Sequence, residues 1–383
     1  MDKNVYYSRG TYEQYDEYME LINIVFSGKN DGYFENLLPK LYKPELEPAK
    51  NAVIAFEDGK MVAGIGTFPC EIKICGKTIK GMGIGNVAVH PDHRSKGYMK
   101  DLMNFAIDDM VANGYDISAL GGQRQRYGYF TYDIAGTKYD FYVTRTNIRH
   151  VYGNNFDDIA NIKIDPLDRN DNESLDKIAE ILASKPYYHV RDRERLFDIM
   201  STWGAHPHTI KRDGELIGYF VINGSINEIN LANDADFTDV IRAIINRNGE
   251  CSFKIAPFQT EYVKVLEFLA EGVNLQSDNM YTITCFRRVI DAFLTLKATY
   301  ANLMDGKMTV LVHGRGGDEN FTITVCNNNV TVEATDAQPD IELTHKEAVN
   351  IFFANVSTAR NRAPAIISQW FPVPIWLYNS DDV

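Results

Sequence analysis

The segment HRSKGYMK, residues 93–100, combines basic side chains with a glycine directly before a helical pattern. Arg94 and Lys96 bring positive charge, and Gly97 allows the backbone to approach a ligand closely. A helix that begins here leaves its first amide groups unpaired, and these favour a bound anion. The amides would come from Ser95, Lys96, Gly97, Tyr98, Met99 and Lys100. The segment predicts a pyrophosphate site, and a solvated turn is the alternative.

Other candidates for phosphate or metal chemistry fit their patterns less well. The segment GMGIGN, with glycines at 81, 83 and 85, precedes a strand, whereas the glycines of a dinucleotide-binding loop follow one. His206 and His208 form an HxH pair without a carboxylate or thiol at matching spacing, which favours loop histidines over zinc ligands. The segment RDRERLFDIM, residues 191–200, is typical of a charged helix start. We predict no metal site.

A strand before the basic segment and a helix after it would hold it in place. The strand is the apolar run over residues 87–89, which ends at Pro91. The helix has one apolar face and ends at Asn113-Gly114. That face is formed by Met99, Leu102, Met103, Ala106, Ile107 and Met110. The order strand, basic turn, helix is the one that a phosphate site needs.

The rest of the chain predicts more hairpins and a weak repeat. Apolar runs over residues 51–90, separated by Asp58-Gly59 and by a turn at 75–77, predict an antiparallel meander. A helix is expected over residues 12–26 and a strand over 115–120. TIKRDGELIGYFVI, residues 209–222, resembles AFEDGKMVAGIGTF, residues 55–68, which suggests a duplicated unit. The second copy has no counterpart of HRSKGYMK, so we expect it not to bind the same ligand.

Composition limits the class of protein. The 383 residues suffice for two or three domains, and 45% of them are hydrophobic. A net charge of -13 argues against nucleic acid or an anionic membrane as the main partner. The amino-terminal residues lack a signal pattern and no apolar run is long enough to span a membrane, so we expect a cytoplasmic protein. The five cysteines, an odd number without a CxxC pair, are expected to be reduced.

The segment VAVHPDHRSKGYMKDLM resembles the acetyl-CoA motif of the GCN5-related N-acetyltransferases (GNAT), which is a strand, then [QR]xxGx[GA], then a helix. Arg94 and Gly97 match this pattern, while Met99 replaces the usual small residue. The resemblance implies that the backbone of the strand pairs with the pantetheine arm of acetyl-CoA. It places further contacts to CoA after the next strand. The residues that it assigns in this way are Val87, Ala88, Val89, Gly122 and Gln123.

The whole chain is similar to the Eis (enhanced intracellular survival) acetyltransferases. The loop HRSKG, the segment RYGYFTYDIAG and the ending FPVPIWLYNSDDV carry this resemblance. It implies an α+β (mixed α/β) protein with tandem GNAT domains, a catalytic one over residues 1–150 and a degenerate one over 151–284. A third α/β domain over residues 285–383 would resemble the sterol carrier protein. The family also implies a homo-oligomer, commonly a hexamer.

In the Eis family a tyrosine acts as general acid and the terminal carboxylate acts as general base, which here implies Tyr127 and Val383. Tyr129 and Tyr132 are rivals for the first role. We therefore expect an acetyl-CoA-dependent N-acetyltransferase that acts on a primary amine of an aminoglycoside, polyamine or lysine-like acceptor. The alternatives are a non-enzymatic module that binds CoA or a lipid, and an enzyme that transfers another acyl or aminoacyl group.

Overall fold

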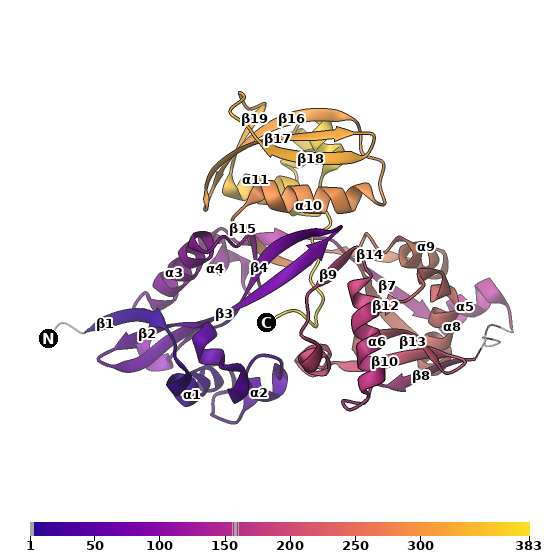
Figure 1. The fold of residues 1–383 in the computed structure, drawn as a ribbon, viewed down its shortest axis with the longest axis horizontal. Coiled ribbons are helices and arrows are strands. Elements are labelled where there is room, and N and C mark those ends of the chain that lie inside the picture. The colour runs from indigo at the N-terminus through magenta and orange to yellow at the C-terminus, as the bar shows by residue number, and fades with distance from the viewer. Residues whose placement is uncertain (1–3, 155, 157–158, 160) are drawn as a thin grey trace.

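The computed structural model describes residues 4–154, 156, 159 and 161–383. These residues form three sheets, each with its own helices, and the carboxyl-terminal tail passes from the third sheet's domain to a point between the other two (Figure 1). No helix in this described part of the chain has the length and apolar character needed to cross a membrane. All five cysteines are free thiols.

The first sheet contains the predicted meander. Its main path is β1 (Val5–Arg9), β2 (Ala52–Glu57), β3 (Lys60–Ile74), β4 (Lys77–Val89), β5 (Ile117–Leu120), β15 (Asn279–Ile283) and β6 (Asp133–Ala135). A short strand, β9 (Tyr187–His189), pairs with β3 off this path. The hairpin turns at residues 58–59 and 75–76 lie where the sequence predicts them. The contact between β4 and β5 is parallel, which brings the chain back through a helix.

Helices cover both faces of this sheet. Val53 and Ala55 of β2 pack with α3 (Tyr98–Ala112), while Ile54 on the other face packs with α1 (Tyr15–Ser27) and α2 (Tyr33–Leu37). The apolar face of α3 is the predicted one, except that Tyr98 is buried and Met99 is only half-buried. Tyr98, the first residue of the helix, therefore points into the core, and Met99 lies beside the preceding loop.

The second sheet repeats the order of the first. Its path is β8 (Ile162–Pro166), β10 (His206–Arg212), β11 (Glu215–Asn223), β12 (Ser225–Leu231), β13 (Glu250–Ile255), β7 (Lys138–Thr144) and β14 (Val273–Gln276). In both sheets the contact between the fourth and fifth strands is parallel and the other contacts along the path are antiparallel. The matching order supports the duplication that the sequence suggests.

The two halves exchange strands at the sixth position of each sheet, and the second half also adds β9 to the first sheet. The sixth position of the first sheet is β15, from the segment predicted as the second domain, and the sixth position of the second sheet is β7, from the predicted first domain. The predicted boundaries at residues 150 and 284 therefore do not coincide with the sheets. The local sequence pattern does not reveal such an exchange, because the pairing of strands that are distant in sequence depends on tertiary contacts.

The remaining helices of the second half are α5 (Arg145–Tyr152), α6 (Asn172–Ala183), α7 (Leu196–Met200), α8 (Phe237–Asn248) and α9 (Thr260–Leu269). The link from β12 to α8 is residues 232–236, with the sequence ANDAD. Its Asp234 and Asp236 would repel a phosphate, and they bind Lys185 and Arg212 instead. The second half therefore lacks the basic loop, as predicted.

The third sheet has the order β18 (Asn329–Ala334), β17 (Gly317–Cys326), β16 (Gly306–Gly314), β19 (Ile341–Thr344). It packs with α10 (Phe286–Ala298), α11 (His345–Phe353) and α12 (Ala365–Trp370). Thr344 caps α11, since its side chain accepts from the Glu347 amide. One continuous apolar core joins this domain to Ile72 and Ile117 of the first sheet and to Trp376 of the tail. This shared core holds the tail against the first sheet.

Candidate functional site

The loop between β4 and α3 presents unpaired backbone amides. Ser95 and Gly97 have left-handed φ values of 63° and 92°, which turn the chain sharply before α3 begins. Within the described residues, the amides of Ser95, Lys96, Gly97 and Met99 make no hydrogen bond. The sequence predicts a free amide at Lys100 as well, but this amide donates to the Gly97 carbonyl oxygen at 2.9 Å and so makes the first hydrogen bond of the helix. The loop retains the donors that an anion needs.

The positive charge of the loop is distributed differently from the prediction. The Lys96 ammonium donates to both carboxylate oxygens of Glu57, at 2.9 and 3.2 Å, and that carboxylate is almost fully buried. Lys96 therefore fastens the loop to β2. Arg94 and Lys100 are exposed, and neither makes an ion pair with any residue that the structure describes. They are the cations available to a ligand.

A groove of about 1010 Å³ runs along the loop and the end of β4. The ladder between β4 and β5 stops at the Ile84–Leu120 pair, so residues 85–89 have no strand on that side in the described part of the chain. Val87 and Val89 line the groove, whereas Ala88 points to the opposite face and is fully buried. The whole loop from Arg94 to Lys100 also lines it. The open backbone edge and the loop amides thus share one groove.

Gly122 and Gln123 lie beyond this groove. They follow β5, are exposed, and do not line it. Gly122 has a φ of 124°, and a Cβ there would meet the Tyr127 ring at 3.0 Å. The Gln123 carbonyl oxygen accepts from the amides of Arg126 and Tyr127 and begins α4 (Arg124–Tyr127). In this structure the two residues position the tyrosine.

Three tyrosines compete for the role of proton donor, and their surroundings differ. Tyr129 is 89% exposed, while the hydroxyl of buried Tyr132 is bound to the Ser118 hydroxyl at 2.7 Å. Tyr127 is 7% exposed, and burial raises its pKa although nearby Arg126 opposes this. It lines neither this groove nor the cavity described below. Its neighbours Arg126 and Phe130 do line the groove.

The last residue of the sequence lies on the glycines of β4. A Cβ at Gly83 would lie 2.5 Å from Val383 Cγ2, and one at Gly85 would lie 3.3 Å from the Val383 carbonyl carbon. Gly81, Gly83 and Gly85 share one face of the strand because side chains alternate. GMGIGN is therefore not a phosphate loop. These glycines give β4 a flat surface on which the end of the tail lies, next to residues 85–89, whose backbone edge is open.

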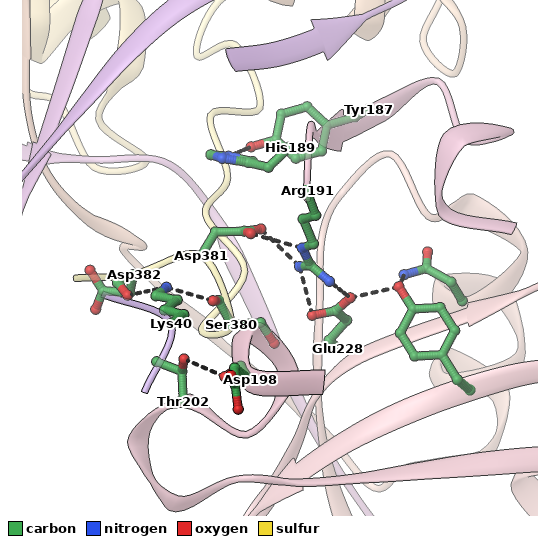
Figure 2. A network of polar contacts seen from close by, with 12 residues as sticks. Lys40, Tyr187, His189, Arg191, Asp198, Thr202, Glu228, Ser380, Asp381 and Asp382 are labelled. Atoms are coloured by element: carbon green, nitrogen blue, oxygen red, sulfur yellow. Dashed lines mark hydrogen bonds and ion pairs between the residues drawn. The ribbon is translucent and has the colours of Figure 1, made fainter. Parts of the chain in front are cut away.

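A buried ionic network fixes the tail (Figure 2). Arg191 binds Asp381 of the tail at 2.8 and 2.9 Å and Glu228 of β12 at 2.8 and 3.0 Å. The Lys40 ammonium donates to the carbonyl oxygens of Ser380 and Asp382, at 2.7 and 2.6 Å. The network joins the amino-terminal half, the second half and the tail.

The charges in this network depend on one another. Burial lowers the pKa of Lys40 to about 8, although Asp381 and Asp382 oppose the shift. Burial raises the pKa of Asp381, but the adjacent Arg191 and His189 more than offset this and hold it at about 2. Burial also lowers the pKa of His189, so this side chain is neutral near pH 7. Asp381 is therefore a structural anion, paired with Arg191.

A cavity of about 370 Å³ lies where the tail meets the first sheet. Gly81 and Gly83 of β4, Ile117 of β5 and Val383 line it, together with Phe293 of the third domain. The cavity and the groove meet β4 at successive positions. Val383 lines the cavity over Gly83 and Gly85 and does not line the groove.

The remaining candidates have structural roles. His206 and His208 lie on β10, and the His208 ring stacks on Phe220 with centroids 4.8 Å apart. No group of three metal-ligating side chains occurs in the described ranges. Arg191, predicted as part of an exposed helix start, is instead buried before α7, because its charge is matched by two carboxylates distant in sequence.

Sequence reasoning missed Lys40, Glu228 and His189. Each is an isolated polar residue in an unremarkable stretch of sequence. One signal was available: the apolar tail contains two adjacent aspartates, Asp381 and Asp382, which require partners if the tail is buried. The partners themselves come from three different parts of the chain.

Comparison with known proteins identifies the first domain. Residues 7–135 match the model of the acetyltransferase (GNAT) domain. No curated protein sequence matches the chain. The first domain is therefore an acetyltransferase domain, a type that transfers acyl groups from CoA, and the prediction of an enzyme is confirmed.

Solved structures share the fold over the whole chain. A GCN5-related N-acetyltransferase from Kribbella flavida has a TM-score of 0.66 and 15% identity, with 97% of this chain and 96% of that chain covered. One from Anabaena variabilis has a TM-score of 0.66 and 14% identity, with 98% of both chains covered. Eis1 from Mycobacterium abscessus has a TM-score of 0.65 and 13% identity, with 100% of both covered. The predicted mixed α/β fold is confirmed, and at these identities the likeness shows the fold alone.

Proposed function

We propose that this chain transfers an acetyl group from acetyl-CoA to a primary amine. The observation that carries the proposal is the position of Val383, which lines the cavity over Gly83 and Gly85 of β4, the strand whose next residues line the groove. The groove would hold acetyl-CoA, with its pyrophosphate on Arg94 and the amides of Ser95, Lys96, Gly97 and Met99, and its pantetheine arm along residues 87–89. The cavity would hold the amine.

The proposed chemistry is direct attack. The amine nitrogen bonds to the acetyl carbon, the carbon–sulfur bond breaks, and CoA leaves as a thiolate. Val383 would accept the proton that the amine loses, directly or through a water molecule. A carboxylate is a weak base in water, but a buried one binds a proton more strongly. The tail network and the glycine surface would hold this carboxylate in place.

Tyr127 would donate a proton to the CoA thiolate. Its raised pKa keeps it protonated at neutral pH, which a general acid needs. Arg126 and Phe130, on either side of it, line the groove, which places the segment next to the proposed CoA site. Gly122 and Gln123 would act through the tyrosine, by shaping the turn on which it lies.

The domain organisation belongs to the same proposal. Residues 1–150, completed by β9 and β15 from the second half, would form the catalytic unit. Residues 151–284, completed by β7, would form a degenerate copy, and residues 285–383 a domain related to the sterol carrier protein. The repeated strand order supports the second assignment, and the sheet with helices on it is compatible with the third. Assembly into a homo-oligomer such as a hexamer stays a prediction from the family resemblance.

An extension beyond Val383 tests the base. Adding two glycines moves the carboxylate off β4, so the turnover of an amine panel with acetyl-CoA, followed as release of free thiol, should fall by about 10²- to 10⁴-fold. The dissociation constant of CoA, measured by calorimetry, should stay within about twofold, since the groove is unchanged. Full turnover by the extended protein would exclude Val383 as the base. An unextended protein that binds CoA but acetylates no amine would contradict the proposed activity.

A further inference from the structure

The cavity next to Val383 has mostly apolar walls. Phe68, Ile72 and Ile117 of the first sheet, Phe293 of the third domain, and Ile375 and Trp376 of the tail supply them. All six side chains are at most 5% exposed and belong to the apolar cores of the protein. At about 370 Å³ the cavity lies at the small end of ligand sites, which span about 300–1,000 Å³. It suits a small ligand with an apolar body.

The charged side chains that line the cavity balance one another. The cations are Lys40, Arg191 and Arg195, and the carboxylates are Asp192, Asp381 and Asp382. His189 also lines it and is neutral near pH 7, because burial lowers its pKa. The side chains therefore have no net charge. The one additional anion is the carboxylate that the proposed function assigns to Val383.

Two of the three lining carboxylates are already bound to a cation. Asp381 binds Arg191 through both oxygens, as Figure 2 shows, and Asp192 binds the Arg195 guanidinium at 3.0 Å. The Asp382 carboxyl group makes no ion pair with any residue that the structure describes, and burial raises its pKa, which favours the uncharged form; the Lys40 ammonium donates to the Asp382 backbone carbonyl oxygen. Apart from the Asp382 carboxyl group, which burial biases toward its uncharged form, a second or third ammonium on a ligand would find no free anion, so it would have to break one of these pairs or remain uncompensated. Both alternatives are costly in a buried site.

We infer that the acceptor is a small primary amine with a single positive charge and an apolar alkyl or aryl body. This inference rests on the proposed function. The ammonium group would lie against the Val383 carboxylate and lose its proton there, while its body occupies the apolar part of the cavity. Polycations such as polyamines and aminoglycosides, two of the acceptor classes expected from the sequence, would be poor substrates.

An acceptor series tests this inference with the full-length protein at pH 7, where Lys40 remains mostly charged. Thiol release is measured with acetyl-CoA and either hexylamine or phenethylamine, each with one charge, or spermidine or kanamycin, each with several. We expect kcat/KM to be at least about tenfold higher for the two monoamines, because burying one uncompensated charge weakens binding by more than about tenfold. Faster turnover of a polycation would overturn the inference and leave the acetyltransferase intact. Absence of acetylation with all four amines, with CoA binding intact, would overturn the proposed function and the inference with it.

A charge added at the cavity rim gives an independent test. Val190 lines the cavity and is 49% exposed, so it tolerates a polar side chain. Val190→Glu supplies one unpaired carboxylate, and Val190→Gln is the neutral control of the same shape. The ratio of kcat/KM for 1,6-diaminohexane to that for hexylamine should rise about fivefold in the glutamate variant alone, as expected for one charge pair near the surface. Equal ratios in the two variants would overturn the charge argument.

Discussion

Replacing Gly83 by alanine should disable the site without changing the CoA groove. Gly83 lies in β4 with extended backbone, so alanine is compatible with the strand. Its Cβ would lie 2.5 Å from Val383 Cγ2, whereas carbon atoms pack at about 3.5–4.0 Å. The tail end must therefore move by about 1 Å. A displacement of this size at a reacting group costs about 10²-fold in rate.

The assay is thiol release with a saturating amine, together with calorimetry of CoA binding. We expect kcat of Gly83→Ala to fall about 100-fold and the dissociation constant of CoA to change less than about twofold. Gly81→Ala is the matched control, because a Cβ there would meet the Cys70 thiol at 2.6 Å rather than the tail. Equal losses of kcat in the two variants would refute the reasoning.

A second substitution distinguishes displacement of the Val383 carboxylate from a general loss of structure. Val383→Gly removes the side chain that an alanine at 83 would strike and leaves the backbone carboxylate. The double variant Gly83→Ala/Val383→Gly should regain at least about tenfold in kcat over Gly83→Ala alone, the coupling expected of two residues in contact. A double variant no faster than the slower single variant would show that the contact does not set the position of the carboxylate.

Three further predictions concern the tail network and the loop. Arg191→Met leaves the buried carboxylates of Asp381 and Glu228 without their partner, so urea unfolding should show a loss of about 3–5 kcal/mol; a loss under 1 kcal/mol would contradict the network. Because the folded pKa of Asp381, about 2, lies below its usual 3.8, its stabilising contribution is present above pH 4 and is lost as the pH falls toward 2. Asp381→Asn should therefore flatten the dependence of the unfolding free energy on pH in that window, and unchanged dependence would exclude the pair as its cause. Arg94→Met should weaken CoA binding about tenfold without lowering Tm, whereas Lys96→Met should lower Tm because it leaves Glu57 buried without its ammonium partner; calorimetry and thermal unfolding distinguish these effects, and the reverse pattern would refute the assignment.

The parts of the site that come from neighbouring residues could be predicted from the sequence. The apolar period of α3, the turn before it and the hairpins of β2, β3 and β4 lie where they are predicted. These features depend on contacts within a few residues, so the local pattern of glycines and apolar side chains is sufficient. The charge assignment within the loop was partly wrong, because Lys96 is bound to Glu57 on another strand.

The parts that join distant segments could not be predicted in this way. The exchange of β7 and β15 depends on which sheet offers each strand an apolar face, and this is decided only when both sheets are formed. Arg191 has the sequence context of an exposed helix start, yet it is buried because Glu228 and Asp381 approach it from two other elements.

The sequence by itself determined the helix α3, the hairpins of the first sheet, the basic glycine turn between β4 and α3, and a tail too apolar to remain in solvent, since each follows from local spacing or composition. The tertiary structure alone decided where that tail goes: glycines at 81, 83 and 85 leave one face of β4 bare, and Lys40 and Arg191 hold the tail over it. The reason is physical. A glycine in a strand and a charge in a polar segment have no preferred partner until folding brings a complementary shape and an opposite charge within a few ångströms of them.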